Sequence, residues 1–391
     1  MPSSVAMTAP TSQPAPDVVV IGGGIVGVAT AAHLAEAGRR VVLVERETLG
    51  AGASGRNSGV VQHPFDPVLV GLHLETIELY RRLGDASGGT FRLPEEPSGL
   101  LQVTTDVALA RRLTAELTAT HPGLAPSFLD TDDARRLEPG LAPGIAACRL
   151  EIGYPVGPWR ATHAYGEYAM ALGVTVRTGT VARPWVERGR SVGVALDDGR
   201  TIAAETVVVA AGPWSPTLID PSGRWRPIRP SWGVVVAVTL PDAPRHVLEE
   251  AEIDIEPGGS GEPVEAPGAG QAFSLITADG ASSLGSTFLD EVPDPAAFFT
   301  SIIERGSRFV PAFATAPVEG HRVCARPLSR DGRPLIGRVP GVDGLWLAAG
   351  HGPWGISTGP ASGRLVADLI SGRVADPPAE LAPARFGPVI A

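Results

Sequence analysis

The residues with the clearest chemical meaning are three glycines near the start of the chain. Gly22, Gly24 and Gly27 form a GxGxxG pattern directly after the apolar run VVVI, and the next apolar run, VVLV, is followed by Glu45. In a strand–turn–helix–strand unit, this spacing lets backbone approach a pyrophosphate at the helix N-terminus, and the acid accepts hydrogen bonds from ribose hydroxyls. The pattern therefore predicts a dinucleotide site, but it does not distinguish NAD from FAD.

A second glycine-rich segment lies near the other end of the chain. Residues 344–363 read GLWLAAGHGPWGISTGPASG, which predicts a strand, a turn and the start of a helix. The positive end of that helix dipole could face an anion. A simple NAD-dependent enzyme is not expected to return to such a motif, so this segment favours FAD.

Composition excludes several classes of protein. The chain has no lysine, so all 32 basic residues are arginine, and Schiff-base, pyridoxal phosphate and P-loop chemistry lack their essential residue. A net charge of -10 argues against a nucleic-acid partner. Cys148 and Cys324 are too few for a disulfide framework or a zinc site, which fits a reducing cytoplasm and predicts no metal. No apolar run is long enough for a transmembrane segment.

The order of apolar runs predicts two regions in a discontinuous arrangement. Beyond the first βαβ unit, the sequence indicates helices near 106–120 and 131–137, and a hairpin around the DDGR turn. After a disordered leader over residues 1–16, we expect a nucleotide-binding domain over 17–97, 151–225 and 320–380. We expect a substrate domain over 98–150 and 226–319, with one mobile acidic Gly/Pro loop.

Three further stretches carry a resemblance to a known family. With AGASGRNSGVV, VVVAAGPWS and CARPLSRDGRPLIG in view, the chain resembles the D-amino-acid oxidase family of flavoproteins, especially its glycine oxidase and sarcosine oxidase branches, over about residues 17–372. The resemblance implies an α/β fold: a Rossmann-like FAD-binding domain and an α+β substrate domain with a mixed or antiparallel sheet. It also implies oxidation of a C–N bond in an amino acid or secondary amine, by hydride transfer to flavin N5, with O₂ or a quinone or dye as electron acceptor.

The glycine pattern and the resemblance together give the expected cofactor contacts. They are Gly22, Gly24, Ile25, Val26, Gly27, Glu45, Arg46, Ser54, Arg56, Asn57, Ser58, Gly59, Val181, Ala211, Gly212, Trp214, Arg326, Gly350, His351, Gly352, Trp354, Gly355 and Ile356. The loop from Gly350 to Gly355 would direct backbone N–H groups at the flavin and stabilise its reduced, anionic form.

Four side chains are candidates for a part in the reaction. Arg326 stands where glycine-oxidase-like proteins carry the arginine that grips the substrate carboxylate, although an ion pair with Asp331 would also explain it. His63 and His351 could act as a base, and His63 could orient the substrate, with a structural role as the alternative for His63. Trp354 is expected at the flavin face or in the substrate wall.

Cys324 and Arg326 together combine features of two branches of the family. Cys324 stands where the monomeric sarcosine oxidases carry the cysteine linked to the flavin, yet those enzymes have tyrosine at the position of Arg326. A small buried cysteine on a strand needs no such role. We therefore expect non-covalent FAD, with a link through Cys324 as the alternative.

Two other functions and one question about the acceptor stay open at this point. The chain could oxidise a 2-hydroxy acid, which requires a base for the hydroxyl proton, or it could be the flavin subunit of a hetero-oligomeric oxidase. Where sarcosine oxidases carry a lysine that assists O₂ reduction, the resemblance places the uncharged Ser283. It therefore predicts slow turnover with O₂ and faster turnover with a quinone or dye.

Overall fold

The computed structural model describes residues 15–251 and 270–389 of the chain. The predicted leader lies outside these ranges except for its last two residues, and so does most of the predicted acidic Gly/Pro loop. No helix within the described ranges combines the length and the hydropathy needed to cross a membrane.

The glycine-flanked apolar runs from both ends of the chain meet in one six-stranded sheet. Its strands, in spatial order, are β18 (Leu335–Arg338), β19 (Leu345–Ala349), β12 (Thr206–Val209), β1 (Val18–Ile21), β2 (Val41–Val44) and β8 (Thr175–Arg177). All pair in parallel except β18, which is antiparallel to β19. Every residue of β1 and β2 is buried, as parallel strands covered on both faces require.

Helices from distant parts of the sequence pack together beside this sheet. They are α1 (Ile25–Glu36), α3 (Pro67–Ala86), α6 (Arg160–Ala171) and α9 (Gly355–Ile370). The axes of α1 and α9 approach closely because glycine lies at the contact: a Cβ on Gly363 would stand 2.7 Å from the backbone nitrogen of Thr30. The sequence does not predict α3, which begins at an N-cap, Asp66, whose carboxylate accepts hydrogen bonds from Val68 and Leu69.

The second sheet has eight strands and is mixed. Its strands, in spatial order, are β17 (Val318–Ser329), β13 (Ile228–Val238), β16 (Ala281–Thr287), β15 (Gln271–Ala278), β14 (Val247–Glu250), β4 (Leu100–Thr104), β6 (Ala146–Leu150) and β5 (Ser127–Leu129). Only the β14–β4 pair is parallel. Helices α4 (Val107–Thr120), α5 (Thr131–Leu137) and α8 (Ala296–Phe309) pack against this sheet.

The membership of the sheets locates the boundaries between the two regions. β17 pairs with β13 along its length, so the chain stays with the second sheet through Ser329, although the expected boundary is at 320. The smaller elements are α2 (Ala53–Arg56), α7 (Ser215–Ile219), the two-stranded sheet of β3 (Val60–Val61) and β7 (Tyr154–Pro155), and the three-stranded sheet of β9 (Ala182–Glu187), β10 (Arg190–Leu196) and β11 (Thr201–Ala203). The predicted α/β architecture, with a mostly parallel sheet and a mixed, mainly antiparallel one, is confirmed.

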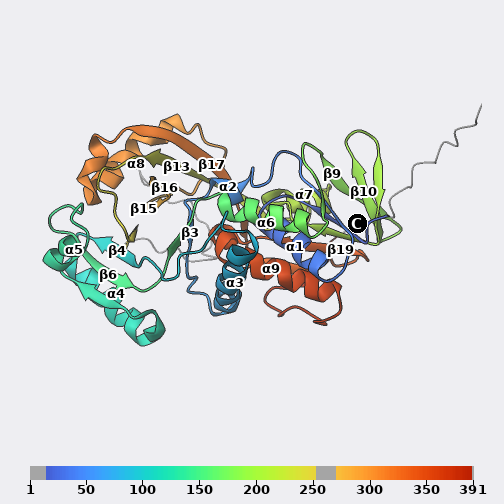
Figure 1. Ribbon diagram of the computed structural model, residues 1–391, viewed down its shortest axis with the longest axis horizontal. Coiled ribbons are helices and arrows are strands. Elements are labelled where there is room, and N and C mark those ends of the chain that lie inside the picture. The colour runs from blue at the N-terminus through green and yellow to red at the C-terminus, as the bar shows by residue number, and fades with distance from the viewer. Residues whose placement is uncertain (1–14, 252–269, 390–391) are drawn as a thin grey trace, which may run out of the picture.

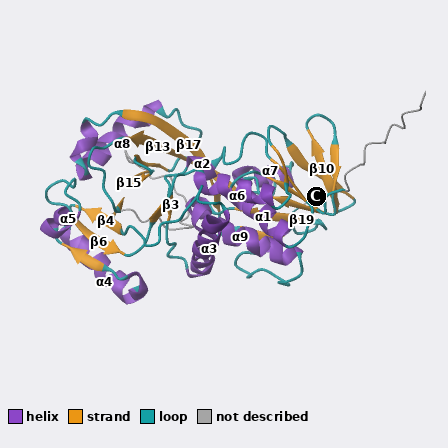
Figure 2. Cartoon of the chain, in the orientation of Figure 1, coloured by secondary structure: helices purple, strands orange, loops and turns teal. Residues whose placement is uncertain are grey.

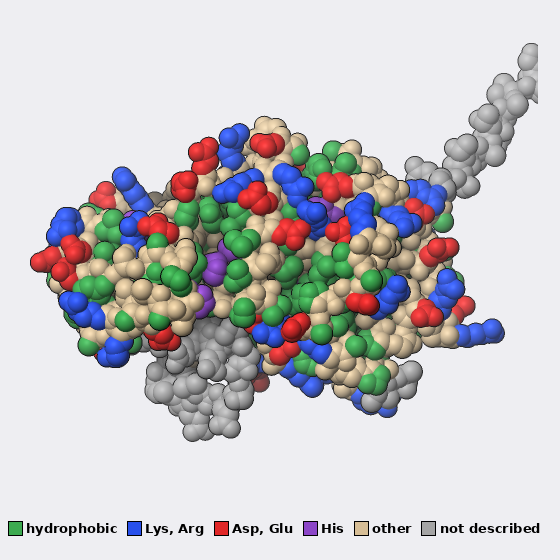
Figure 3. Space-filling model, turned by 90° about the horizontal axis from the view of Figure 1, so that it is seen from below, with side chains coloured by type: hydrophobic (Ala, Val, Ile, Leu, Met, Phe, Trp, Pro, Cys, Tyr) green, Lys and Arg blue, Asp and Glu red, His purple; other side chains and the backbone are tan. Residues whose placement is uncertain are grey.

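The two regions lie side by side along the long axis of the molecule, with α3 between them (Figure 1). The helices α1, α6 and α9 gather on the nucleotide side, whereas α4, α5 and α8 lie at the outer end of the other region (Figure 2). On the face seen in Figure 3, the described acidic and basic side chains are interspersed, with hydrophobic side chains among them. That face has no field of a single sign of the kind that steers a polyanion.

Candidate functional site

A cavity of about 760 Å³ runs from the glycine turns of the six-stranded sheet to the inner face of the eight-stranded sheet. This volume is typical of ligand pockets. The cavity meets the carboxyl ends of β1, β2, β12 and β19, where parallel α/β sheets bind their ligands.

Most of the residues expected to contact the cofactor line this cavity. They are Gly22, Gly24, Ile25, Val26, Glu45, Arg46, Ser54, Asn57, Ser58, Gly59, Val181, Ala211, Gly212, Trp214, Arg326, His351, Gly352, Trp354, Gly355 and Ile356. The structure therefore brings together segments that are separated by more than 300 residues in the sequence.

The glycine turn after β1 is shaped by close backbone approach. Gly22 has a φ of +115°, and a Cβ there would collide with the carbonyl oxygen of Ala210. A Cβ on Gly27 would collide with the carbonyl oxygen of Gly22, so Gly27 serves the packing of the turn and does not line the cavity. A Cβ on Gly24 would meet Ser54, with Oγ at 3.0 Å, so the bare backbone of Gly24 leaves room for a close approach of the pyrophosphate.

Backbone N–H groups surround this turn. Ser54 Oγ accepts a hydrogen bond of 2.9 Å from the Ile25 N–H, the first of helix α1. The Glu45 carboxylate accepts hydrogen bonds from the N–H of Gly23 at 2.6 Å and of Glu47 at 2.9 Å. An acid held in this way at the end of β2 lies where a ribose would be bound.

The rest of the nucleotide end of the cavity is lined by an arginine and a tryptophan. The Arg46 guanidinium lies 4.0 Å from the centre of the Trp214 ring, and both side chains line the cavity beside Val181. A flat, polarisable surface of this kind suits an aromatic base.

Three other predicted residues do not line the cavity. Arg56 is exposed and donates a weak hydrogen bond of 3.5 Å to the Val323 carbonyl. Gly350, with a φ of +91°, shapes the turn after β19. His63 is buried with its ring edge-on to Phe65 and His73, and burial lowers its pKa.

Arg326 lies on the inner face of the eight-stranded sheet. Its Nη1 donates a hydrogen bond of 2.8 Å to the Thr287 carbonyl, its Nη2 donates one of 2.8 Å to Ser286 Oγ, and its Cζ lies 4.5 Å from the centre of the Phe288 ring. Burial lowers the pKa of this guanidinium. No carboxylate among the described residues pairs with it, although it lines the cavity.

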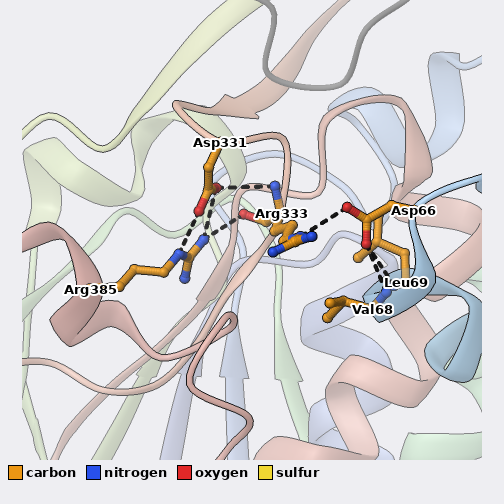
Figure 4. Close-up of polar contacts among 6 residues, drawn as sticks. All are labelled: Asp66, Val68, Leu69, Asp331, Arg333 and Arg385. Atoms are coloured by element: carbon orange, nitrogen blue, oxygen red, sulfur yellow. Dashed lines mark hydrogen bonds and ion pairs between the residues drawn. The ribbon is translucent and has the colours of Figure 1, made fainter.

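The alternative partner of Arg326 is occupied elsewhere. Asp331 forms an ion pair of 2.7 Å with Arg385 and accepts a hydrogen bond from the Arg333 backbone, while the Arg333 side chain pairs with Asp66 at 2.8 Å (Figure 4). The hypothesis of an Arg326–Asp331 ion pair is therefore wrong.

His351 and Trp354 lie in the turn between β19 and α9. Nε2 of His351 lies 2.9 Å from Ser362 Oγ, and burial lowers the pKa of this histidine to about 4. The Trp354 indole N–H is buried and has no hydrogen-bond partner among the described residues. An unpartnered donor in the wall of the cavity is consistent with a bound polar group, and the described residues therefore fit a flavin dinucleotide.

Cys324 and Arg322 share the inner face of β17 with Arg326. Cys324 is a free, buried thiol, and burial raises its pKa. Arg322 Nη2 donates a hydrogen bond of 2.6 Å to Ser283 Oγ. A cation is thus held next to the uncharged Ser283, although neither side chain lines the cavity.

Several polar residues of the substrate end are missed by sequence reasoning. Gln62, Gln102, Glu249, Ser274 and Ser286 all line the cavity. A polar residue in the centre of the run LLQVT was a signal for Gln102, because the strand around it is apolar on both faces. Glu249 gives no such signal, since its strand is short and lies beside the acidic segment.

Comparisons with known proteins identify the family of the chain. The family model described as FAD dependent oxidoreductase matches residues 17–369. The chain is 32% identical to a glycine oxidase of Pseudomonas aeruginosa, over 94% of this chain and 98% of that protein. It is 27% identical to a D-amino acid dehydrogenase of Cereibacter sphaeroides, over 91% and 92%.

A solved structure shows the same fold over nearly the whole chain. The glycine oxidase of Geobacillus kaustophilus superposes with a TM-score of 0.79 at 26% identity, covering 95% of this chain and 98% of the other. The predicted family, the FAD cofactor and the class of enzyme are therefore confirmed. The chain belongs to the FAD dependent oxidoreductase family, among its amino-acid oxidases and dehydrogenases.

Proposed function

We propose that this enzyme oxidises the C–N bond of a glycine-, sarcosine- or D-amino-acid-type substrate whose carboxylate is held by Arg326. One observation carries the proposal: the half-buried guanidinium of Arg326, which has no carboxylate partner among the described residues, lines the same cavity as the glycine turns. A planar guanidinium pairs bidentately with a carboxylate and stays charged when buried. The glycine oxidase and D-amino acid dehydrogenase relatives support an amino-acid substrate.

The protein's own part in this reaction is positioning. Bound FAD supplies the acceptor for the hydride. Arg326 orients the substrate, and the turn over residues 351–355, which lines the cavity at the N-terminus of α9, would offer backbone donors to the flavin. If the amine binds deprotonated, no side-chain base is required, and holding the reacting atoms about 3–3.5 Å apart provides much of the rate enhancement.

The geometry favours an amine over a 2-hydroxy acid. A hydroxy acid needs a base, yet His63 lies outside the cavity lining, and His351, with a pKa of about 4 and Ser362 beside its Nε2, is a weak base at neutral pH. Product analysis separates the two reactions, because only amine oxidation releases ammonia or a free amine.

Arg322 bears on the electron acceptor. A cation held beside the flavin would favour the first electron transfer to O₂ by stabilising the developing superoxide. Arg322 donates a hydrogen bond to Ser283 and so holds a cation next to the position that the resemblance assigns to the lysine, although neither side chain lines the cavity. We propose O₂ as a competent acceptor beside a quinone or dye.

We also propose the cytoplasm as the compartment, supported by two free cysteines, Cys148 and Cys324.

The test is an anaerobic flavin-bleaching screen of the purified chain with glycine, sarcosine, proline, D- and L-amino acids, simple amines and hydroxy acids. We expect a yellow protein that bleaches with an amino acid. A single chain that bleaches with no amine would favour the flavin subunit of a hetero-oligomer.

For Arg326→Ala we expect kcat/KM for a carboxylated substrate to fall, by an amount that corresponds to about 2–4 kcal/mol of lost transition-state stabilisation. An equal loss with an amine that lacks a carboxylate would show that Arg326 is structural.

A further inference from the structure

Glu249 is an acid in the cavity wall that the proposed reaction leaves without a role. On β14 it lies opposite Ser274 of β15, and Ser274 lies opposite Gly285 of β16. Residues directly opposite each other in neighbouring strands point to the same face of the sheet. Glu249 and Ser274 both line the cavity, as does Gln102, which is in register with Glu249 on β4.

Arg326 lies on that same face. Gly285 is opposite Val235 of β13, and Val235 is opposite Arg322 of β17. Residues four positions apart along a strand share a face, so Arg326 enters the cavity from the same side as Glu249. The sheet thus presents a cation from β17 and an acid from β14 to one cavity.

The two charges are separated by about the length of a small substrate. The Arg326 guanidinium reaches across to β16, where it contacts Ser286 and Thr287. Only β15 lies between β16 and β14. The guanidinium lies over Gly233 of β13 and reaches toward β16, so two to three strand spacings of about 4.8 Å, or about 10–14 Å, separate it from the backbone of Glu249.

Glu249 has no partner of opposite charge. Within residues 15–251 and 270–389 no ion pair includes it, whereas the adjacent Glu250 pairs with Arg305 at 2.7 Å. The strands on either side of β14, which are β4 and β15, carry no charged residue. The counter-charge is therefore missing on every neighbouring strand.

The rest of the sequence cannot supply a basic side chain either. Residues 252–269 contain five acids and no arginine, lysine or histidine, and residues 1–14 and 390–391 contain no basic side chain. Every arginine and histidine of the chain therefore lies in the described ranges, and none of them pairs with Glu249.

The surroundings of Glu249 are polar but incompletely bonded. Burial raises the pKa of this carboxyl to about 7, and the side chain of Gln62 acts in the opposite direction. Among the described residues, Oε1 and Nε2 of Gln62 and Oε1 of Gln102 are buried without a hydrogen-bond partner of normal geometry. Buried polar atoms are usually bonded, so this end of the cavity fits a ligand with several donors.

We propose that Glu249 binds a cationic group at the distal end of the substrate, and that the enzyme prefers amino acids carrying a terminal amine or guanidinium. This rests on the proposed function, because Arg326 must hold the carboxylate at the other end. A substrate of the lysine, ornithine or arginine type has its two charges at opposite ends of a flexible chain. With hydrogen bonds of about 3 Å at each end, such a chain spans the separation.

A binding experiment tests the site without turnover. The probe 6-aminohexanoate has a carboxylate and a terminal amine but no oxidisable α-amine, and hexanoate is its match without the terminal amine. Both are titrated into the FAD-loaded enzyme and followed by the flavin absorbance and by calorimetry. We expect the wild-type enzyme to bind 6-aminohexanoate at least tenfold more tightly than hexanoate. We expect Glu249→Gln to bind the two probes about equally tightly.

A matched control removes a negative charge from outside the cavity. Glu319 on β17 is exposed and does not line the cavity, so Glu319→Gln removes one carboxylate without touching the site of Glu249 or the nucleotide end. We expect the tenfold preference to persist in this variant. Equal binding of the two probes by the wild type, or an unchanged preference in Glu249→Gln, would overturn the proposal.

Turnover separates this proposal from the proposed function. Matched pairs are lysine with norleucine, ornithine with norvaline, and arginine with citrulline, each as both enantiomers. We expect the cationic member to have the higher kcat/KM by at least tenfold. If neutral amino acids reduce the flavin equally well, the role of Glu249 is wrong while amino-acid oxidation stands. If no amino acid reduces the flavin but 6-aminohexanoate binds selectively, amino-acid oxidation is wrong while the role of Glu249 stands.

Discussion

The guanidinium of Arg326 lies directly over Gly233 of the neighbouring strand. A Cβ at Gly233 would stand 2.7 Å from Arg326 Cζ and 2.6 Å from Nη1. Real Cβ atoms do not approach other atoms this closely, so the arginine keeps its position only because residue 233 has no side chain. The glycine is thus part of the proposed carboxylate site although it cannot contact a substrate through a side chain.

For Gly233→Ala we expect the guanidinium to be displaced and kcat/KM for a carboxylated substrate to fall by at least tenfold, since a shift of about 1 Å in a positioning group has effects of this size. Steady-state kinetics measure this loss. Gly320→Ala is the matched control on the partner strand, because a Cβ there would meet nothing within 4 Å. If both variants behave alike, the contact with Arg326 is not the cause.

The Cys324 thiol is expected to leave the flavin free. Only a thiolate is nucleophilic, and burial raises the pKa of this thiol. After acid precipitation, we expect yellow flavin in the supernatant and a colourless pellet. A coloured pellet that becomes colourless in Cys324→Ser would instead establish a covalent link.

Arg322→Met should slow the reaction of the reduced enzyme with O₂ and spare the reaction with a neutral dye. The substitution keeps an unbranched chain while it removes the charge held at Ser283. Stopped-flow mixing of the reduced enzyme with air-saturated buffer gives the rate, and an effect of about tenfold is expected. Ser283→Ala, which keeps the cation, is the control. Equal slowing with O₂ and dye would assign Arg322 to the structure of the flavin site.

The preference for cationic substrates should depend on pH. In the free enzyme, Glu249 with a pKa of about 7 is largely neutral below this pH and charged above it. The kcat/KM ratio of lysine to norleucine should therefore rise as the pH increases through about 7. Taking the ratio largely cancels the titration of the α-amines, and of His63, Cys324 and His351. A ratio that rises equally in Glu249→Gln would contradict this assignment.

Much of the nucleotide end could be predicted because its determinants are local. Gly22 and Gly27 are required by backbone contacts within one βαβ unit, and Glu45 ends the adjacent strand. The spacing of these residues in the sequence is set by the geometry of that unit. The fold class follows from the same patterns, since buried parallel strands are apolar throughout.

The substrate end depends on pairings between distant segments, which one sequence does not reveal. Glu249 enters the cavity because β14 pairs in parallel with β4, and the two strands are separated by more than 140 residues. The Arg322–Ser283 contact likewise depends on the order of β17, β13 and β16. Alternation along each strand indicates which residues share a face, but not which strands are neighbours.

The two ends of the substrate cavity rest on strands of very different length. β17 pairs with all eleven residues of β13, whereas β14 has only four residues. The long ladder fixes the backbone under Arg326 before any substrate arrives, so recognition of the carboxylate is preorganised. Attempts to change the substrate range should therefore vary β14 and leave β13 and β17 intact, because a short strand can accept new side chains without disturbing the anchor that all such substrates would share.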